Sequence, residues 1–269
     1  MHPLRLTKSS RKEETLMGNI VIAQGGIPIQ QGIYEESITK KADLGRLLPF
    51  SDGRCFRYCY KATGAGITRG HIAAAAALND SVDTVTQTGM TVTISGGHIG
   101  AKVIKVLLSA DVAANLFDDG LLTIEDGTGL GYCYRIKSNK AGGTPVADAC
   151  ELTLYDPIVI ALAADAVLSL TEHKYQNVVV APVDEKSTLV GVPLIDITAE
   201  YYFWAQTKGY AAVMSDTAQN PAAGDLVSIG TTTPGSCRTG EGTVYQPFGV
   251  CIQIGSAHSK YCTIDLMLE

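Results

Sequence analysis

The chain has 269 residues, of which 46% are hydrophobic and only 18% are charged, and its formal net charge is -6 with an isoelectric point near 5.4. This acidic balance argues against a nucleic-acid partner, because phosphate binding requires clustered Lys and Arg on the contact face. No stretch approaches the roughly 18 apolar residues that a membrane-spanning helix needs, which argues against a membrane partner. The low share of charged residues predicts instead that partners cover part of the surface. We therefore expect the chain to form a homo-oligomer.

Two different stretches make up the predicted extended N-terminal arm, residues 1–33. The first 16 residues carry four Lys or Arg and lack the apolar core of a signal peptide, so they are interpreted as a flexible leader or as residues upstream of a start at Met17. Residues 18–32, here called the strap, carry no charge and show no helical periodicity. The strap is predicted to lie extended on a neighbouring subunit or a capsid. The isoleucines expected at that interface are Ile20, Ile22, Ile27, Ile29 and Ile33.

Residues 34–185 are predicted to form a β-rich lobe. One short helix is expected at Ile72–Leu78, because its five consecutive alanines carry the lowest helix cost, and so short a helix must dock on the sheet to be stable. Residues 118–137 predict a hairpin with a wide Gly-rich loop. Period-two or β-branched patterns predict strands at residues 55–61, 84–88, 90–95, 102–107 and 151–154.

Residues 186–269 are predicted to form a small C-terminal β-barrel. Tyr201–Thr207 indicates a strand that a turn at Lys208-Gly209 ends, with further strands at residues 211–214, 226–229, 244–254 and 261–268. The whole chain is thus predicted to be mainly β. It would consist of short-stranded barrel or sandwich lobes with one or two short Ala-rich helices.

The aromatic cluster at the start of that barrel contains the only Trp of the chain. Alternation along a strand would place Tyr202 and Trp204 on one face, with Phe203 and Ala205 on the other. One face is expected to be core and the other a subunit interface, which adds Tyr202 and Trp204 to the expected interface residues. Stacking on a glycan, with Gln206 as the polar partner, is the alternative.

The run Gly127-Thr128-Gly129-Leu130-Gly131 has the composition of part of a dinucleotide-binding loop. Such a loop needs a following helix whose N-terminus binds the pyrophosphate, but residues 132–137 predict a strand. A hairpin turn is therefore the preferred interpretation.

Metal binding has two weak candidates. The carboxylates of Asp118, Asp119, Glu125 and Asp126 could offer oxygen ligands to calcium, although EF-hand spacing is absent and solvated turn residues are the simpler interpretation. Cys55 and Cys59 would share one face of a strand, but zinc would need two further ligands. We expect seven reduced, structural cysteines and no cofactor.

No catalytic signature occurs at a convincing spacing. The histidines stand apart from one another in the sequence, and His258, beside Ser256 and Ser259, has no Gly-x-Ser-x-Gly elbow before it. The sequence therefore predicts a protein that is not an enzyme. A hydrolase with an unrecognised site is one alternative.

Several segments in succession resemble virion structural proteins from the head-gene modules of tailed bacteriophages. These segments are EESITKKADLG at 35–45, DGRCFRY at 52–58, DG at 119–120 through GYCYRI at 131–136, LYDPI at 154–158 and YYFWAQTKG at 201–209. Together they extend over most of residues 35–268. Their order is more specific than any one of them.

The predicted C-terminal barrel also resembles capsid decoration, or cement, proteins, which sit as trimers on the outside of the head and bridge major capsid subunits. The resemblance implies a trimer made in the host cytoplasm and located on the capsid exterior, with the phage major capsid protein as its partner. It also implies that the strap clamps the capsid as an added strand. A head-fibre or host-glycan-binding phage protein of the same architecture is the first alternative, ahead of the hydrolase.

Overall fold

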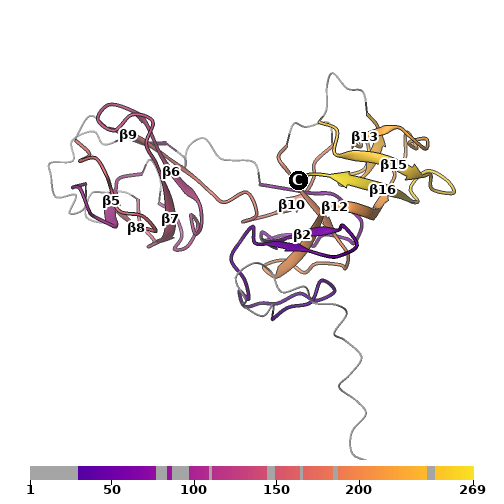
Figure 1. The fold of residues 1–269 in the computed structure, drawn as a ribbon, viewed down its shortest axis with the longest axis horizontal. Helices are drawn as coiled ribbons and strands as arrows, with labels where there is room; N and C mark the ends of the chain where they lie inside the picture. Colours follow the sequence, from indigo (N-terminus) through magenta and orange to yellow (C-terminus); the bar gives the residue numbers. More distant parts are fainter. Residues whose placement is uncertain are drawn as a thin grey trace, which may run out of the picture.

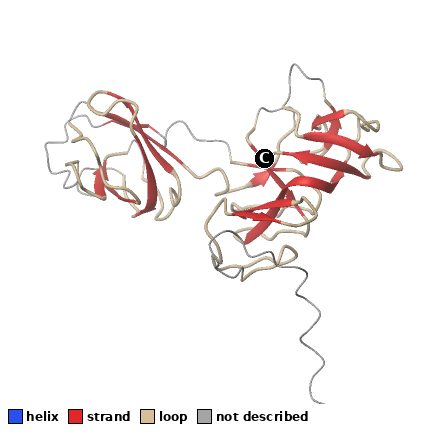
Figure 2. Ribbon diagram, viewed as in Figure 1, coloured by secondary structure: helices blue, strands red, loops and turns tan. Residues whose placement is uncertain are grey.

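The computed structural model describes residues 30–76, 84–86, 97–108, 111–143, 149–163, 166–183, 187–240 and 246–269. The residues in these ranges form strands joined by turns and include no helix. The strands build one sheet of ten strands and one of six (Figures 1 and 2). The prediction of a mainly β, barrel-like fold is confirmed.

The six-stranded sheet comes from one continuous stretch of the chain and has the order β4-β9-β6-β7-β8-β5. Its strands are β4 (Thr84–Thr86), β5 (Val103–Val106), β6 (Leu121–Asp126), β7 (Cys133–Asn139), β8 (Cys150–Leu154) and β9 (Val167–Thr171). As predicted, β6 and β7 form a hairpin, in which Leu122 lies opposite Tyr134. Alternation buries Leu122 and Ile124 in a single hydrophobic core and leaves Leu121 exposed.

The ten-stranded sheet combines two distant parts of the chain and curls into half of a barrel (Figure 1). The first part gives β1 (Leu47–Pro49), β2 (Cys55–Tyr60) and β3 (Ala73–Ala74). The second part gives β10 (Val179–Val180), β11 (Leu189–Pro193), β12 (Tyr202–Met214), β13 (Leu226–Ile229), β14 (Cys237–Thr239), β15 (Gly249–Gln253) and β16 (Tyr261–Met267). The order is β10-β3-β11-β12-β16-β15-β13-β14, with β2 paired to both β12 and β1.

The six-stranded sheet is inserted between β3 and β10, which pair with each other at Ala73 and Val180. The two ends of the inserted stretch therefore lie side by side. The predicted boundary between residues 185 and 186 does not coincide with the division between the sheets, because β1 to β3 pair with the C-terminal strands. Pairs such as Tyr58 with Trp204 join residues far apart in sequence, and local patterns carry no information about them.

The predicted turn at Lys208-Gly209 is wrong, because β12 runs unbroken from Tyr202 to Met214. A β-bulge between Gln206 and Lys208 in the pairing with β2, and a φ of 80° at Gly209, account for the residues that suggested a turn. The two faces of the strand were predicted correctly. Trp204 packs in one buried cluster, and Phe203 and Ala205 pack in another.

The predicted helix at Ile72–Leu78 is wrong in its described part. Ala73 and Ala74 form β3, which lies between β10 and β11, and both residues are fully buried. Pairing with two neighbouring strands satisfies the backbone groups of this segment better than a helix of two turns could. Residues 77–78 and the predicted strand at 90–95 lie outside the described residues.

Candidate functional site

Gln31 fixes the N-terminal segment to the ten-stranded sheet. Its backbone carbonyl accepts a hydrogen bond from Trp204 Nε1 at 3.0 Å, and its side-chain Oε1 accepts one from the Tyr58 hydroxyl at 2.7 Å. Its Nε2 donates to the carbonyls of Tyr202 and Glu35, each at 2.9 Å. The residue that follows the apolar part of the strap is therefore buried and held by four hydrogen bonds.

The residues predicted to form an interface fall into two groups. Trp204 is only 1% exposed and belongs to the chain's own core, while Tyr202 and Ile33 are half-buried against the same cluster. Ile20, Ile22, Ile27 and Ile29 lie outside the described residues. The interface role of this set stays a prediction. Trp204 is too deeply buried to contact a partner itself, so its role in an interface would be to hold Tyr202 and Ile33 in place.

A polar hub, formed by Asp119, Lys40, Arg135 and Tyr155, joins the N-terminal segment to the six-stranded sheet. Asp119 has a positive φ of 61° and its side chain is 1% exposed. Its Oδ2 accepts from Lys40 Nζ at 2.9 Å, and its Oδ1 accepts from the Tyr155 hydroxyl at 2.8 Å and from Arg135 Nη2 at 3.1 Å. Arg135 also lies over the Tyr155 ring, 4.7 Å from its centroid.

The hub holds its carboxylate ionised. Burial by itself raises the pKa of Asp119, but the hydrogen bonds from Lys40 and Tyr155 and the charge of Arg135 outweigh it and lower the pKa. Burial, with the bond to Asp119, raises the pKa of Tyr155 to about 12. The sequence marked Asp119 as a calcium candidate, but its partners are cations and a hydroxyl group, so the structure makes it an ion-pair centre.

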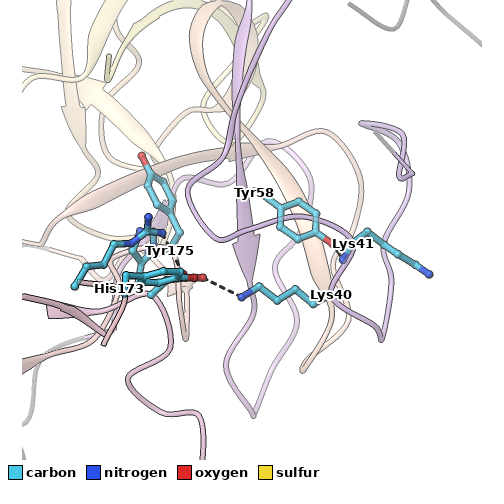
Figure 3. Close-up of polar contacts among 8 residues, drawn as sticks. Lys40, Lys41, Tyr58, His173 and Tyr175 are labelled. Atoms are coloured by element: carbon cyan, nitrogen blue, oxygen red, sulfur yellow. Dashed lines mark hydrogen bonds and ion pairs between the residues drawn. The ribbon is translucent and has the colours of Figure 1, made fainter. Parts of the chain in front are cut away.

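His173 lies beside this hub, since the charges of Asp119, Arg135 and Lys40 all act on its imidazole. Figure 3 shows His173 and Lys40 in this region, and the dashed line from Lys40 marks its bond to Asp119. The turn at Gly45 packs directly on the imidazole, since a Cβ at Gly45 would lie 2.6 Å from His173 Cε1. Burial lowers the pKa of His173 to about 4. Neither His173 nor Asp119 is poised for proton transfer near neutral pH, because both pKa values lie well below 7. The arrangement is suited to holding segments together.

Three thiols lie close together in the core of the ten-stranded sheet, those of Cys237 on β14, Cys251 on β15 and Cys262 on β16. Cys262 Sγ accepts a hydrogen bond from the Gly255 N–H at 3.2 Å. Hydrogen bonding from the Cys237 thiol is the main cause that lowers the pKa of Cys262 to about 6. All three are buried, and the seven cysteines are free, so these thiols pack in the core.

An exposed apolar surface covers β12, β16, β15 and β13, and we call it the outer face. In the sheet register Tyr210 lies beside Asp265, Asp265 beside Val250, and Val250 beside Leu226. The large exposed side chains on this face are Tyr210, Leu226, Ile252, Tyr261 and Met267. Sequence reasoning missed this surface, since the alternation that identified the strands did not say which side the fold would leave uncovered.

The remaining motif predictions can be compared with the structure one by one. A strand follows the Gly127–Gly131 run, which confirms the hairpin interpretation. No group of three or more His, Cys, Asp or Glu in the described ranges is arranged to hold a metal ion. Within the same ranges, no helix is long and apolar enough to cross a membrane.

Comparisons with known proteins found no matching family model, no matching curated protein and no matching solved structure.

Proposed function

We propose that this chain is a structural virion protein that decorates and stabilises a bacteriophage capsid by bridging major capsid subunits, without catalysis. The resemblance of its segments to phage head proteins supports this proposal. The structural observation that carries it is the outer face, an apolar surface of the kind that neighbouring copies cover in an assembly.

Such a surface suits a protein that acts in many copies. Each Å² of apolar surface removed from water contributes about 25 cal/mol, so a modest contact is weak alone. The same contact repeated around a closed oligomer and over a lattice becomes strong through effective concentration. A trimer on the capsid exterior would use its binding surfaces in this way.

The test uses heads assembled from the phage major capsid protein without this chain. Purified full-length protein is expected to co-sediment with the heads saturably and to raise the temperature at which they rupture. Heads already saturated with unlabelled protein provide the control. Absence of binding at micromolar concentration would overturn the decoration role.

One observation favours glycan binding as a second candidate. Tyr132 is exposed at the end of the β6–β7 hairpin and stacks on Tyr134, with ring centroids 6.4 Å apart, next to exposed Leu130. An exposed aromatic face offers an apolar platform on which a sugar ring can stack. A glycan array probed with the wild-type chain and with Tyr132→Ala tests this candidate, which requires a signal that the variant loses.

A further inference from the structure

The outer face is apolar across four neighbouring strands. Tyr210 is 61% exposed, Met267 is 50% exposed and Leu226 is 49% exposed. The only charged residues on it are Lys208 and Asp265, which lie at diagonal positions of β12 and β16. An apolar segment with few charges matches this face best, because Lys208 and Asp265 are the two charged partners that these four strands offer there.

The chain itself contains a segment of that composition. The strap has no charged residue between positions 18 and 32, and positions 19–29 hold five Ile or Val. Its C-terminal end is fixed, since Gln31 is buried against Trp204 and Tyr58. About a dozen residues in extended conformation span up to roughly 40 Å, which is enough to cross four strands.

The side of the sheet on which the strap is anchored favours a second copy as the acceptor. Val192 pairs with Gln206 and lies in the core cluster of Ile264 and Leu266, so Trp204, two residues before Gln206, faces that inner side. The bulge between Gln206 and Lys208 shifts the alternation of β12 by one residue. Tyr210, which alternates with the buried Ala211, therefore lies on the opposite side from Trp204. The strap thus starts from the inner side of its own sheet, and its own outer face lies behind that sheet.

We infer that residues 18–29 of one copy pack on the outer face of a second copy, so that the oligomer is held together by exchanged straps. This inference rests on the proposed function, because it specifies the self-association that a decoration protein would use. It concerns contacts between copies and leaves the capsid contact to other surfaces.

Two full-length variants test it. The strap variant replaces Ile20, Ile22, Ile27 and Ile29 with Ser, and the face variant carries Tyr210→Ser and Leu226→Ser. Each alone should weaken self-association at least tenfold in sedimentation velocity, while circular dichroism shows unchanged strand content. A matched control, Val159→Ser with Ile99→Ser, removes exposed apolar side chains outside the ten-stranded sheet and should associate like the wild type.

Mixing the two variants gives the decisive result. The strap variant keeps an intact outer face and the face variant keeps an intact strap, so an equimolar mixture should recover association as mixed pairs. Wild-type association of either variant, or a mixture that remains monomeric, would overturn the inference. Binding to capsid heads is measured separately, so a chain that associates but does not bind heads refutes only the decoration role.

Discussion

The two sheets of this protein are assembled in different ways. The six-stranded sheet uses one continuous stretch, β4 to β9, and encloses one core, whereas the ten-stranded sheet joins β1 to β3 with strands more than 100 residues later and packs three buried clusters. Contacts close in sequence cost less chain entropy to form than distant ones. The comparison indicates that the inserted sheet can hold its structure independently, while the larger sheet depends on long-range pairing.

The largest expected effects separate the two cores. Trp204→Ala should cost about 3 to 5 kcal/mol of unfolding free energy, since it empties a fully buried site and frees the Gln31 carbonyl. Phe117→Ala should cost a similar amount in the six-stranded sheet. Hydrogen exchange read by mass spectrometry should show lost protection only in the sheet that carries the substitution. If either variant loosens both sheets equally, the two sheets form one cooperative unit.

The polar hub is where the two parts meet, and its loss should have an intermediate effect. Asp119→Asn keeps the side-chain shape and tolerates a positive φ, but it leaves Lys40 and Arg135 without their anion, at a cost of about 2 kcal/mol. Exchange protection should fall together in residues 37–46 and in the six-stranded sheet. Asp126→Asn, at the exposed end of β6, should stay within about 0.5 kcal/mol of wild type. Equal effects of the two substitutions would show that the hub does not hold the N-terminal segment to the six-stranded sheet.

The sequence predicted the six-stranded sheet better than the ten-stranded one for a physical reason. Its hairpin and strands have alternating side chains and Gly turns, and their partners are near in sequence, so that local pattern and tertiary pairing agree. In the larger sheet, the strands that pair with a segment determine its secondary structure. Ala73-Ala74 favours a helix locally and becomes a strand between β10 and β11, and Lys208-Gly209 favours a turn and becomes a bulge.

The exposed features also differ in how far the sequence alone could predict them. The strap is defined by composition alone, as an uncharged, isoleucine-rich stretch, and its contact with a partner stays a prediction. The outer face was not recognisable, since Tyr210 and Leu226 join one surface only through the register of β12, β16, β15 and β13. The Asp119 hub gave no usable signal either, because its donors come from three separate segments.

Acid should act on the ten-stranded sheet through Asp216. Burial raises the pKa of this carboxyl, but hydrogen bonds from the Thr232 hydroxyl and from the N–H groups of Thr231 and Thr232 outweigh it and lower the pKa from 3.8 to about 2. The ionised form stabilises the fold fully above pH 3.8, and this contribution, about 1 to 2 kcal/mol, is lost as the pH falls through about 2. Urea unfolding of wild type and Asp216→Asn should differ at pH 5 and converge near pH 2. A difference that stays constant over this range would contradict the assignment.

The smallest expected effects concern the cysteines, and here the two sheets differ in exposure. Cys133 on β7 is exposed, whereas Cys262 on β16 is 1% exposed although its pKa is lowered to about 6, mainly by the Cys237 thiol. Thiolate character alone would make Cys262 a reactive thiol at pH 7.5, because the thiolate is the nucleophile. Burial should prevail, so iodoacetamide should modify Cys133 first and leave Cys262 unmodified until the sheet opens.

Because all seven thiols are free, dithiothreitol should leave the melting temperature unchanged, where a disulfide of about 2 to 4 kcal/mol would shift it by several degrees. Peptide mapping after brief alkylation, with Cys133→Ser as the control, gives the order of reaction. Labelling of Cys262 as fast as Cys133 in the native protein would show that the ten-stranded sheet opens at the β14 to β16 end far more often than its buried contacts predict. That opening would also expose the inner side of the strands whose opposite surface forms the outer face.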